Sequence, residues 1–126
     1  MHNFRELNIW KKSMDITKEV YSVSADFPSE EKYALTSQIR RSAISIPSNI
    51  AEGCGRKSDK ELSHFLSISL GSCFELETQI ELASMLNFID QSHKQALVNE
   101  LTEIQKMISG FTKKTRTESE NLSSKI

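Results

Sequence analysis

Hydrophobic residues recur every three to four positions along four stretches of this chain, which is the spacing of helices with an apolar face. In the first stretch, from about Phe4 to Ala25, they form two stripes that merge into an arc of roughly 200° at about 100° per residue. A surface helix usually needs an apolar arc of only about 100°. The pattern therefore predicts a first helix that is buried from more than one side.

The second stretch follows Asp26-Phe27-Pro28-Ser29, where the proline ends the first helix and the serine is a suitable N-cap. Its apolar register continues to Gly53-Cys54-Gly55, which predicts the end of the helix. Pro47 lies inside this register, where it lacks an N–H group and crowds the carbonyl group of Ala43. We therefore predict one helix kinked at Pro47, in which the Asn49 amide satisfies backbone groups that the kink releases.

The third and fourth stretches have recognisable starts. Ser58 and Glu61 have the spacing of a capping box, and Asp90 or Ser92 is a suitable N-cap for the last helix. The third helix has one continuous stripe, which contains small residues and so indicates close approach of a neighbouring helix: Leu62, Phe65, Leu66, Ser69, Cys73, Leu76, Ile80 and Ala83. The last stripe runs from Leu97 to Phe111.

Four long helices with short connections predict an all-α protein, an antiparallel up-down-up-down four-helix bundle. We expect the bundle over residues 1–113 and a flexible polar tail over residues 114–126, where no apolar stripe continues. A chain of 126 residues and 14.3 kDa is the size of one domain. No apolar run reaches the roughly 18 residues of a membrane span, so we expect a cytoplasmic protein without a membrane partner and with reduced Cys54 and Cys73.

No motif for catalysis, cofactor binding or metal binding stands out. The histidines, His2, His64 and His93, are scattered along the chain, and the two cysteines lack a CxxC spacing. The run from Gly53 to Arg56 is similar to part of a phosphate-binding glycine loop but follows a helix instead of a strand. We therefore expect no enzymatic activity, no cofactor and no bound metal.

The second and third helices carry more apolar residues than one side of each can bury. The surplus residues are Ile44, Pro47 and Ala51 on the second, and Ile68, Leu70, Phe74, Leu82 and Met85 on the third. Such patches commonly mark a subunit interface. We therefore predict a homo-oligomer with an interface, to another copy or to a partner, at Ile44, Pro47, Leu70, Phe74 and Met85. The simpler alternative is that the bundle helices differ in how deeply they are buried, without any subunit interface.

The net charge is only -1, but it is unevenly distributed. Between Glu31 and Lys60 six basic residues accompany three acidic ones, whereas between Glu61 and Glu103 Lys94 stands alone against seven carboxylates. Basic groups near a helix C-terminus complement its dipole, which is a purely structural explanation. Repeated around a ring, they would instead present a positive field to RNA phosphates. The candidate phosphate contacts are Arg40, Arg41, Arg56, Lys57 and Lys60, with Lys11 and Lys12 as weaker candidates.

The run from Gln38 to Gly53, which reads QIRRSAISIPSNIAEG, resembles the hallmark segment of the 23S rRNA intervening-sequence proteins. Residues 4–10, 27–35 and 65–76 agree with this resemblance, which covers roughly residues 4–111. The resemblance implies a bacterial four-helix bundle that assembles into a ring, typically a homopentamer. It also implies a relationship to the accessory variability determinant proteins of diversity-generating retroelements, which work with a reverse transcriptase.

Together, the residues and the resemblance predict a non-enzymatic, ring-forming bundle that binds RNA or a ribonucleoprotein through a basic surface. The alternative is an oligomeric scaffold that binds a protein partner such as a reverse transcriptase. No aromatic stacking platform is evident beside the candidate arginines. We therefore do not expect sequence-specific recognition of single-stranded bases.

Overall fold

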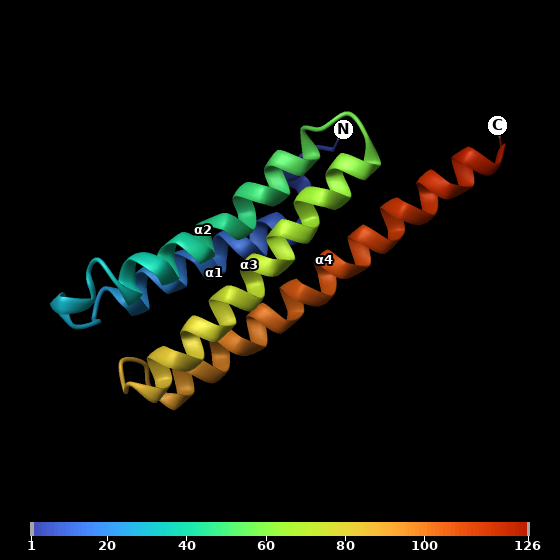
Figure 1. Cartoon of the computed structure of the whole chain (residues 1–126). Helices are drawn as coiled ribbons and strands as arrows, with labels where there is room; N and C mark the ends of the chain where they lie inside the picture. Colours follow the sequence, from blue (N-terminus) through green and yellow to red (C-terminus); the bar gives the residue numbers. More distant parts are fainter. Residues whose placement is uncertain (1, 126) are drawn as a thin grey trace.

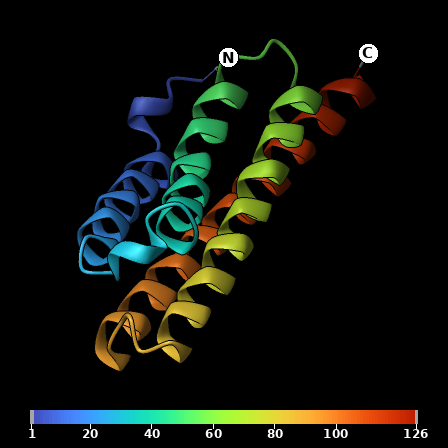
Figure 2. The same ribbon diagram turned by 60° about the vertical axis from the view of Figure 1, so that its left-hand side comes forward.

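The computed structural model describes residues 2–125, with side chains described through residue 118 (Figure 1). The long helices are α1 (Asn8–Ser24), α2 (Leu35–Cys54), α3 (Asp59–Met85) and α4 (Gln91–Lys125). None of residues 2–125 forms a strand. Helices that follow one another in the chain lie side by side, and the chain turns back at each short connection (Figures 1 and 2). The predicted all-α class with four packed helices is confirmed.

The first two helices begin later than the sequence predicted. Phe4–Glu6 forms a separate 3-10 turn, η1, because Leu7 is extended with φ -79° and ψ 127°. The Asn3 carboxamide accepts a hydrogen bond from the Arg5 N–H group at 3.2 Å and so stabilises this turn. After Pro28, Ser29–Glu31 forms a second 3-10 turn, η2, and α2 begins only at Leu35. The predicted start at Phe4 and the predicted cap of the second helix at Ser29 were therefore wrong.

Within the chain α1 buries a single stripe, which consists of Ile9, Ser13, Ile16, Val20 and Ser24. Met14 and Tyr21, which belong to the predicted wide arc, are 44% and 40% exposed. Burial of this helix from more than one side is therefore not found within one chain. The polar members of the stripe donate to carbonyl groups of their own helix, Ser13 to Trp10 and Ser24 to Tyr21.

Pro47 lies buried inside α2, and a neighbouring helix supplies the hydrogen bond that this proline removes. Without an N–H group at residue 47, the Ala43 carbonyl lacks its usual partner within the helix. The Thr17 hydroxyl of α1 lies 3.1 Å from that carbonyl oxygen. Asn49 instead donates to the Ser45 carbonyl at 2.8 Å, so Thr17, and not Asn49, serves the carbonyl group that the proline leaves free. The kink itself stays a prediction.

The contact between α2 and α3 is close and partly polar. The predicted stripe of α3 is buried, except that Phe65 is half-buried. The Ser69 hydroxyl donates to the Ile46 carbonyl at 2.9 Å, and the hydroxyl groups of Ser45 and Ser72 lie 2.7 Å apart. At the end of α2, a Cβ atom on Gly53 would lie 2.9 Å from the Phe65 Cβ atom, so this position requires glycine.

The predicted helix ends around α3 are confirmed, whereas the predicted tail is not. Gly55 follows the last residue of α2, and the Ser58 side chain accepts from the Glu61 N–H group at 3.1 Å. Asp90 caps α4 by accepting from the His93 N–H group at 2.7 Å. Instead of an irregular tail, residues 114–125 continue α4, and Thr115 is only 3% exposed. Residue 126 lies outside the described residues, and the division at residue 113 stays a prediction.

Candidate functional site

Mostly uncharged residues form the outward side of α3 from its middle to its end. The exposed members of this α3 outer face are Ser67, Ile68, Gly71, Phe74, Thr78, Leu82 and Met85. Phe74 is 53% and Met85 77% exposed, although both are large apolar side chains. The acidic side chains nearest to this set are those of Glu75 and Glu81, which are 41% and 47% exposed.

The five predicted interface residues are divided between the outside of the bundle and its interior. Ile44 of α2 is exposed, as are Phe74 and Met85 of α3. Pro47 is buried, and Leu70 is half-buried and packs against the core. Pro47 and Leu70 therefore do not belong to the exposed surface to which the sequence assigned them.

Arg40 and Arg41 are held by contacts within the chain. Arg40 is half-buried: its Nε donates to the Ser24 hydroxyl at 2.8 Å, and its guanidinium lies 4.6 Å from the centre of the Tyr21 ring. Arg41 donates to the Gln38 side chain and forms an ion pair with Glu75 of α3. An aromatic ring does lie beside these arginines, contrary to the prediction. The sequence did not reveal it because Tyr21 and Arg40 belong to different helices.

Arg56, Lys57 and Lys60 lie at the α2–α3 connection, roughly 24 Å from Arg40 at about 1.5 Å per residue along the helix. Arg56 forms an ion pair with Glu52 at 2.5 Å and lies 4.7 Å from the centre of the Phe65 ring. Lys57 and Lys60 are exposed, and neither forms an ion pair with any side chain described here. The five candidate phosphate contacts therefore form two groups.

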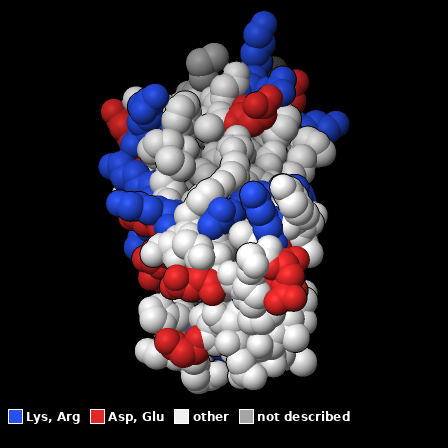
Figure 3. All heavy atoms as spheres, turned by 90° about the vertical axis from the view of Figure 1, so that its left-hand side faces the viewer, with Lys and Arg blue, Asp and Glu red and all other residues white. Residues whose placement is uncertain are grey.

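The basic connection lies at the same end of the bundle as the N-terminus and the later part of α4. The His2 N–H group donates to the Cys54 carbonyl at 3.1 Å, and the His2 ring lies 5.4 Å from the Phe111 ring. Lys114 lines a pocket of about 340 Å³ with His2, and Lys113 and Arg116 are exposed on the same part of α4. The face drawn in Figure 3 is turned away from this end; on it, Lys and Arg side chains lie in the upper and middle parts, and Asp and Glu side chains lie in the lower part.

We call this region, which consists of Arg56, Lys57, Lys60, Lys113, Lys114 and Arg116, the basic end. The sequence revealed only its first three members, because Lys114 and Arg116 come from a segment predicted to be a flexible tail and Lys113 directly precedes that segment. The closely spaced Lys113, Lys114 and Arg116 were the signal that could have revealed it.

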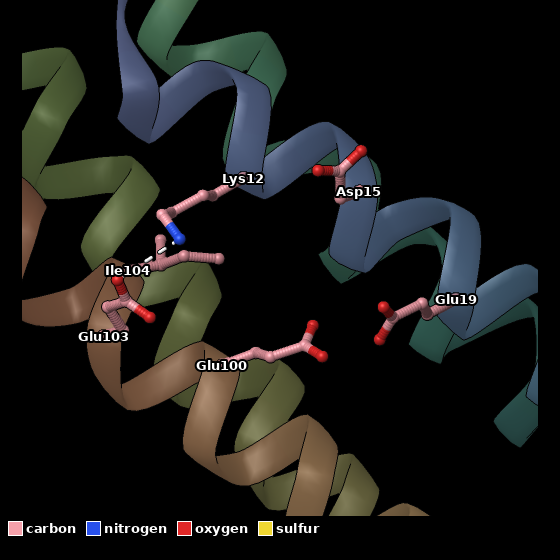
Figure 4. A pocket seen from close by; sticks show the side chains of 6 residues that line it. All are labelled: Lys12, Asp15, Glu19, Glu100, Glu103 and Ile104. Carbon is pink, nitrogen blue, oxygen red and sulfur yellow. Dashed lines mark ion pairs between the residues drawn. The ribbon is translucent and has the colours of Figure 1, made fainter.

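A groove of about 250 Å³ between α1 and α4 carries the opposite charge (Figure 4). The Lys12 ammonium group at its edge lies 3.2 Å from the Glu103 carboxylate. Glu19 and Glu100 point toward one another across the groove (Figure 4). Burial, the hydrogen bond to Glu19 and the negative charges of Glu19 and Asp15 raise the pKa of Glu100 to about 7. Glu100 therefore keeps its proton to a higher pH than an ordinary glutamate does.

Residues 5–110 match the family described as 23S rRNA-intervening sequence protein. The chain belongs to this family. The match includes the basic α2–α3 connection and most of the described bundle, and it ends before Lys113.

A solved structure similar to this member of the 23S rRNA-intervening sequence protein family is a protein of unknown function from the S23 ribosomal protein family of Bacteroides thetaiotaomicron VPI-5482. It is 25% identical to this chain with a TM-score of 0.75, and the match covers 83% of this chain and 98% of the other. No curated protein matches the chain. Neither the family description nor the description of the solved structure names a reaction.

Among the side chains described for this family member, the cysteines and histidines are dispersed. Cys54 and Cys73 are buried, and burial raises the pKa of both thiols, that of Cys73 to about 12. His93 is paired with Asp90, and His64 is exposed beside Phe65. Within the described residues, no three or more His, Cys, Asp or Glu side chains are arranged to hold a metal, and no helix has the length and hydropathy of a membrane span.

Proposed function

We propose that this protein is a self-associating, non-enzymatic helical bundle that binds RNA through phosphate contacts at the basic end. The observation that carries the proposal is the exposure of Lys57 and Lys60 without ion-pair partners among the described side chains. A protein with a net charge of -1 attracts RNA only where cations are concentrated locally. The family description, which refers to 23S rRNA, agrees with an RNA ligand.

The basic end is better suited to phosphate binding than the two arginines of α2. Arg41 already contacts Gln38 and Glu75, so contact with RNA would compete with these interactions. Lys57 and Lys60 lie in the connection and the first turn of α3, where they project from the bundle into solvent. An exposed lysine without an ion pair can contact a phosphate without first breaking an interaction within the protein.

Self-association would multiply this weak local charge. The α3 outer face supports the proposal of an interface between copies, because Phe74 and Met85 are large apolar side chains exposed there. In an assembly, several basic ends would contact one RNA molecule at once, and their contributions would combine as in multivalent binding. The resemblance suggests a pentameric ring.

The test is the affinity of the assembled protein for a structured 23S rRNA fragment. We expect Lys57→Gln/Lys60→Gln to weaken binding by roughly tenfold at low salt. The matched control, Lys18→Gln/Lys106→Gln, removes the same charge from exposed positions on α1 and α4. Equal losses in both variants would indicate an effect of net charge alone and would contradict a site at the basic end.

A second candidate function is that of an adaptor for a protein partner such as a reverse transcriptase. The exposure of Met85 and Phe74 favours it, because the same face can bind a different protein instead of a second copy. In that case Phe74→Ser/Met85→Ser would abolish partner binding, whereas Lys57→Gln/Lys60→Gln would leave it intact.

A further inference from the structure

A second basic surface lies between the end of α1 and the start of α2, opposite in charge to the groove between α1 and α4. It is a shallow groove of about 490 Å³. We call it the tyrosine groove, and its principal lining residues are Tyr21, Lys32, Tyr33, Arg40, Arg41 and Ile44. The turn between η2 and α2 supplies Lys32 and Tyr33, and α1 supplies Tyr21.

Tyr33 is the most unusual residue of this groove. Its side chain is 88% exposed, more than that of any other large hydrophobic residue described in the chain. The Lys32 ammonium group lies 5.4 Å from the centre of its ring, and the rest of the ring contacts solvent. A flat aromatic surface in this state is available for stacking with another planar group.

The charges around Tyr33 indicate what kind of planar group fits. Three cations line the groove, and no Asp or Glu is among the described residues that line it. Arg40 is fixed in place, because it donates to the Ser24 hydroxyl and to the Tyr21 carbonyl while its guanidinium covers the Tyr21 ring. Arg41 is already paired with Glu75, but Lys32 and Arg40 form no ion pair with any described side chain, so an anionic ligand with a flat ring matches this combination.

We propose that the tyrosine groove binds an unpaired nucleotide of single-stranded RNA, with a base stacked on the Tyr33 ring and a phosphate at Lys32. Sequence-tolerant proteins for single-stranded nucleic acids use this combination of stacking and cationic contacts. The arginine plane over Tyr21 offers a second surface on which a neighbouring base can stack. This inference rests on the proposed RNA-binding function and adds recognition of unpaired bases to the phosphate contacts of the basic end.

The test compares a short single-stranded oligoribonucleotide with the corresponding duplex, both at the same low salt concentration. Tyr33→Ala removes the stacking surface, and because this side chain is almost fully exposed, the fold does not depend on it. We expect Tyr33→Ala to weaken single-strand binding by about tenfold and to change duplex binding little. Tyr33→Phe keeps the ring and is expected to retain the affinity of the original protein.

The remaining outcomes separate this inference from the proposed function. If Tyr33→Ala leaves single-strand affinity unchanged while Lys57→Gln/Lys60→Gln weakens it, the tyrosine groove is refuted and RNA binding at the basic end stands. If neither RNA binds to the assembled protein, both proposals fail. The mass of the Tyr33→Ala variant is also measured by light scattering, and we expect it to equal that of the original protein. A lower mass would indicate that the groove contacts a second copy of the chain instead of RNA.

Discussion

The hydrogen bond from Thr17 to Ala43 explains how a proline is accommodated in the middle of α2, and it can be measured. Thr17→Val keeps the shape of the side chain and removes the hydroxyl, so the half-buried Ala43 carbonyl loses the donor found 3.1 Å away. Leaving such a carbonyl without a partner costs about 1–3 kcal/mol. Because the same hydroxyl also lies 2.7 Å from the Ser13 carbonyl, we expect a loss near the low end, about 1 kcal/mol.

Comparing Thr17→Val with proline and with alanine at residue 47 tests whether the hydroxyl compensates for the proline. Pro47→Ala restores an N–H group at residue 47, which can then bond the Ala43 carbonyl within α2. In that background we expect Thr17→Val to cost almost nothing, so a double-mutant cycle yields a coupling energy of about 1 kcal/mol. Thr102→Val is the matched control, since its hydroxyl bonds only the Val98 carbonyl of its own helix.

The assay is urea unfolding followed by far-UV circular dichroism, with all variants at one protein concentration because the proposed self-association would contribute to apparent stability. If Thr17→Val has the same cost with proline and with alanine at residue 47, the hydroxyl does not serve the carbonyl that the proline leaves free.

Three further predictions concern packing, pH dependence and assembly. Gly53→Ala should reduce the free energy of unfolding by about 1–3 kcal/mol, because its Cβ atom would lie 2.9 Å from that of Phe65. The pKa of Glu100 is about 7 in the folded protein instead of its ordinary 4.5, so the folded state binds this proton more tightly than the unfolded state does. The free energy of unfolding should therefore fall as pH rises from about 4.5 to about 7. Glu100→Gln should remove this dependence in chemical unfolding. Phe74→Ser/Met85→Ser should lower the mass that light scattering gives for the assembled protein.

Each of these predictions has a result that contradicts it. Gly71 has open space around its Cβ position, so Gly71→Ala should be neutral or stabilising by up to about 1 kcal/mol, and equal losses at both glycines would refute the packing argument. An unchanged pH dependence in Glu100→Gln would assign the dependence to other groups. Met14→Ser removes an exposed apolar side chain from α1, and a comparable drop in mass there would argue against the α3 outer face as the interface.

The sequence predicted the helices and their buried positions because both depend on the local spacing of apolar residues. The stripe of α3 predicted its buried face correctly, and Ser58 and Asp90 predicted where helices begin. Local periodicity did not predict how far the last helix extends. Residues 114–125 lack an apolar stripe, yet they continue α4, and Thr115 is buried there.

The candidate surfaces were harder to predict because each combines residues that are distant in the chain. Charge counts identified Arg56, Lys57 and Lys60, but only the fold brings the cations of α4 to the same end of the bundle. Tyr33 appeared in the sequence as one aromatic residue in a polar turn. Its significance depends on Arg40 and Arg41, which come to line one groove with Tyr33 only once α2 forms.

The central claim is that this family member binds RNA by neutralising phosphates at the basic end, and its most direct test is the salt dependence of that binding. The measurement is the affinity of the assembled protein for a structured 23S rRNA fragment over a series of salt concentrations, with Lys57→Gln/Lys60→Gln beside it. We expect the logarithm of the association constant to fall linearly with the logarithm of salt concentration, and the slope to flatten by about one to two in the variant. An affinity that does not depend on salt, or the absence of binding at low salt, would contradict the claim.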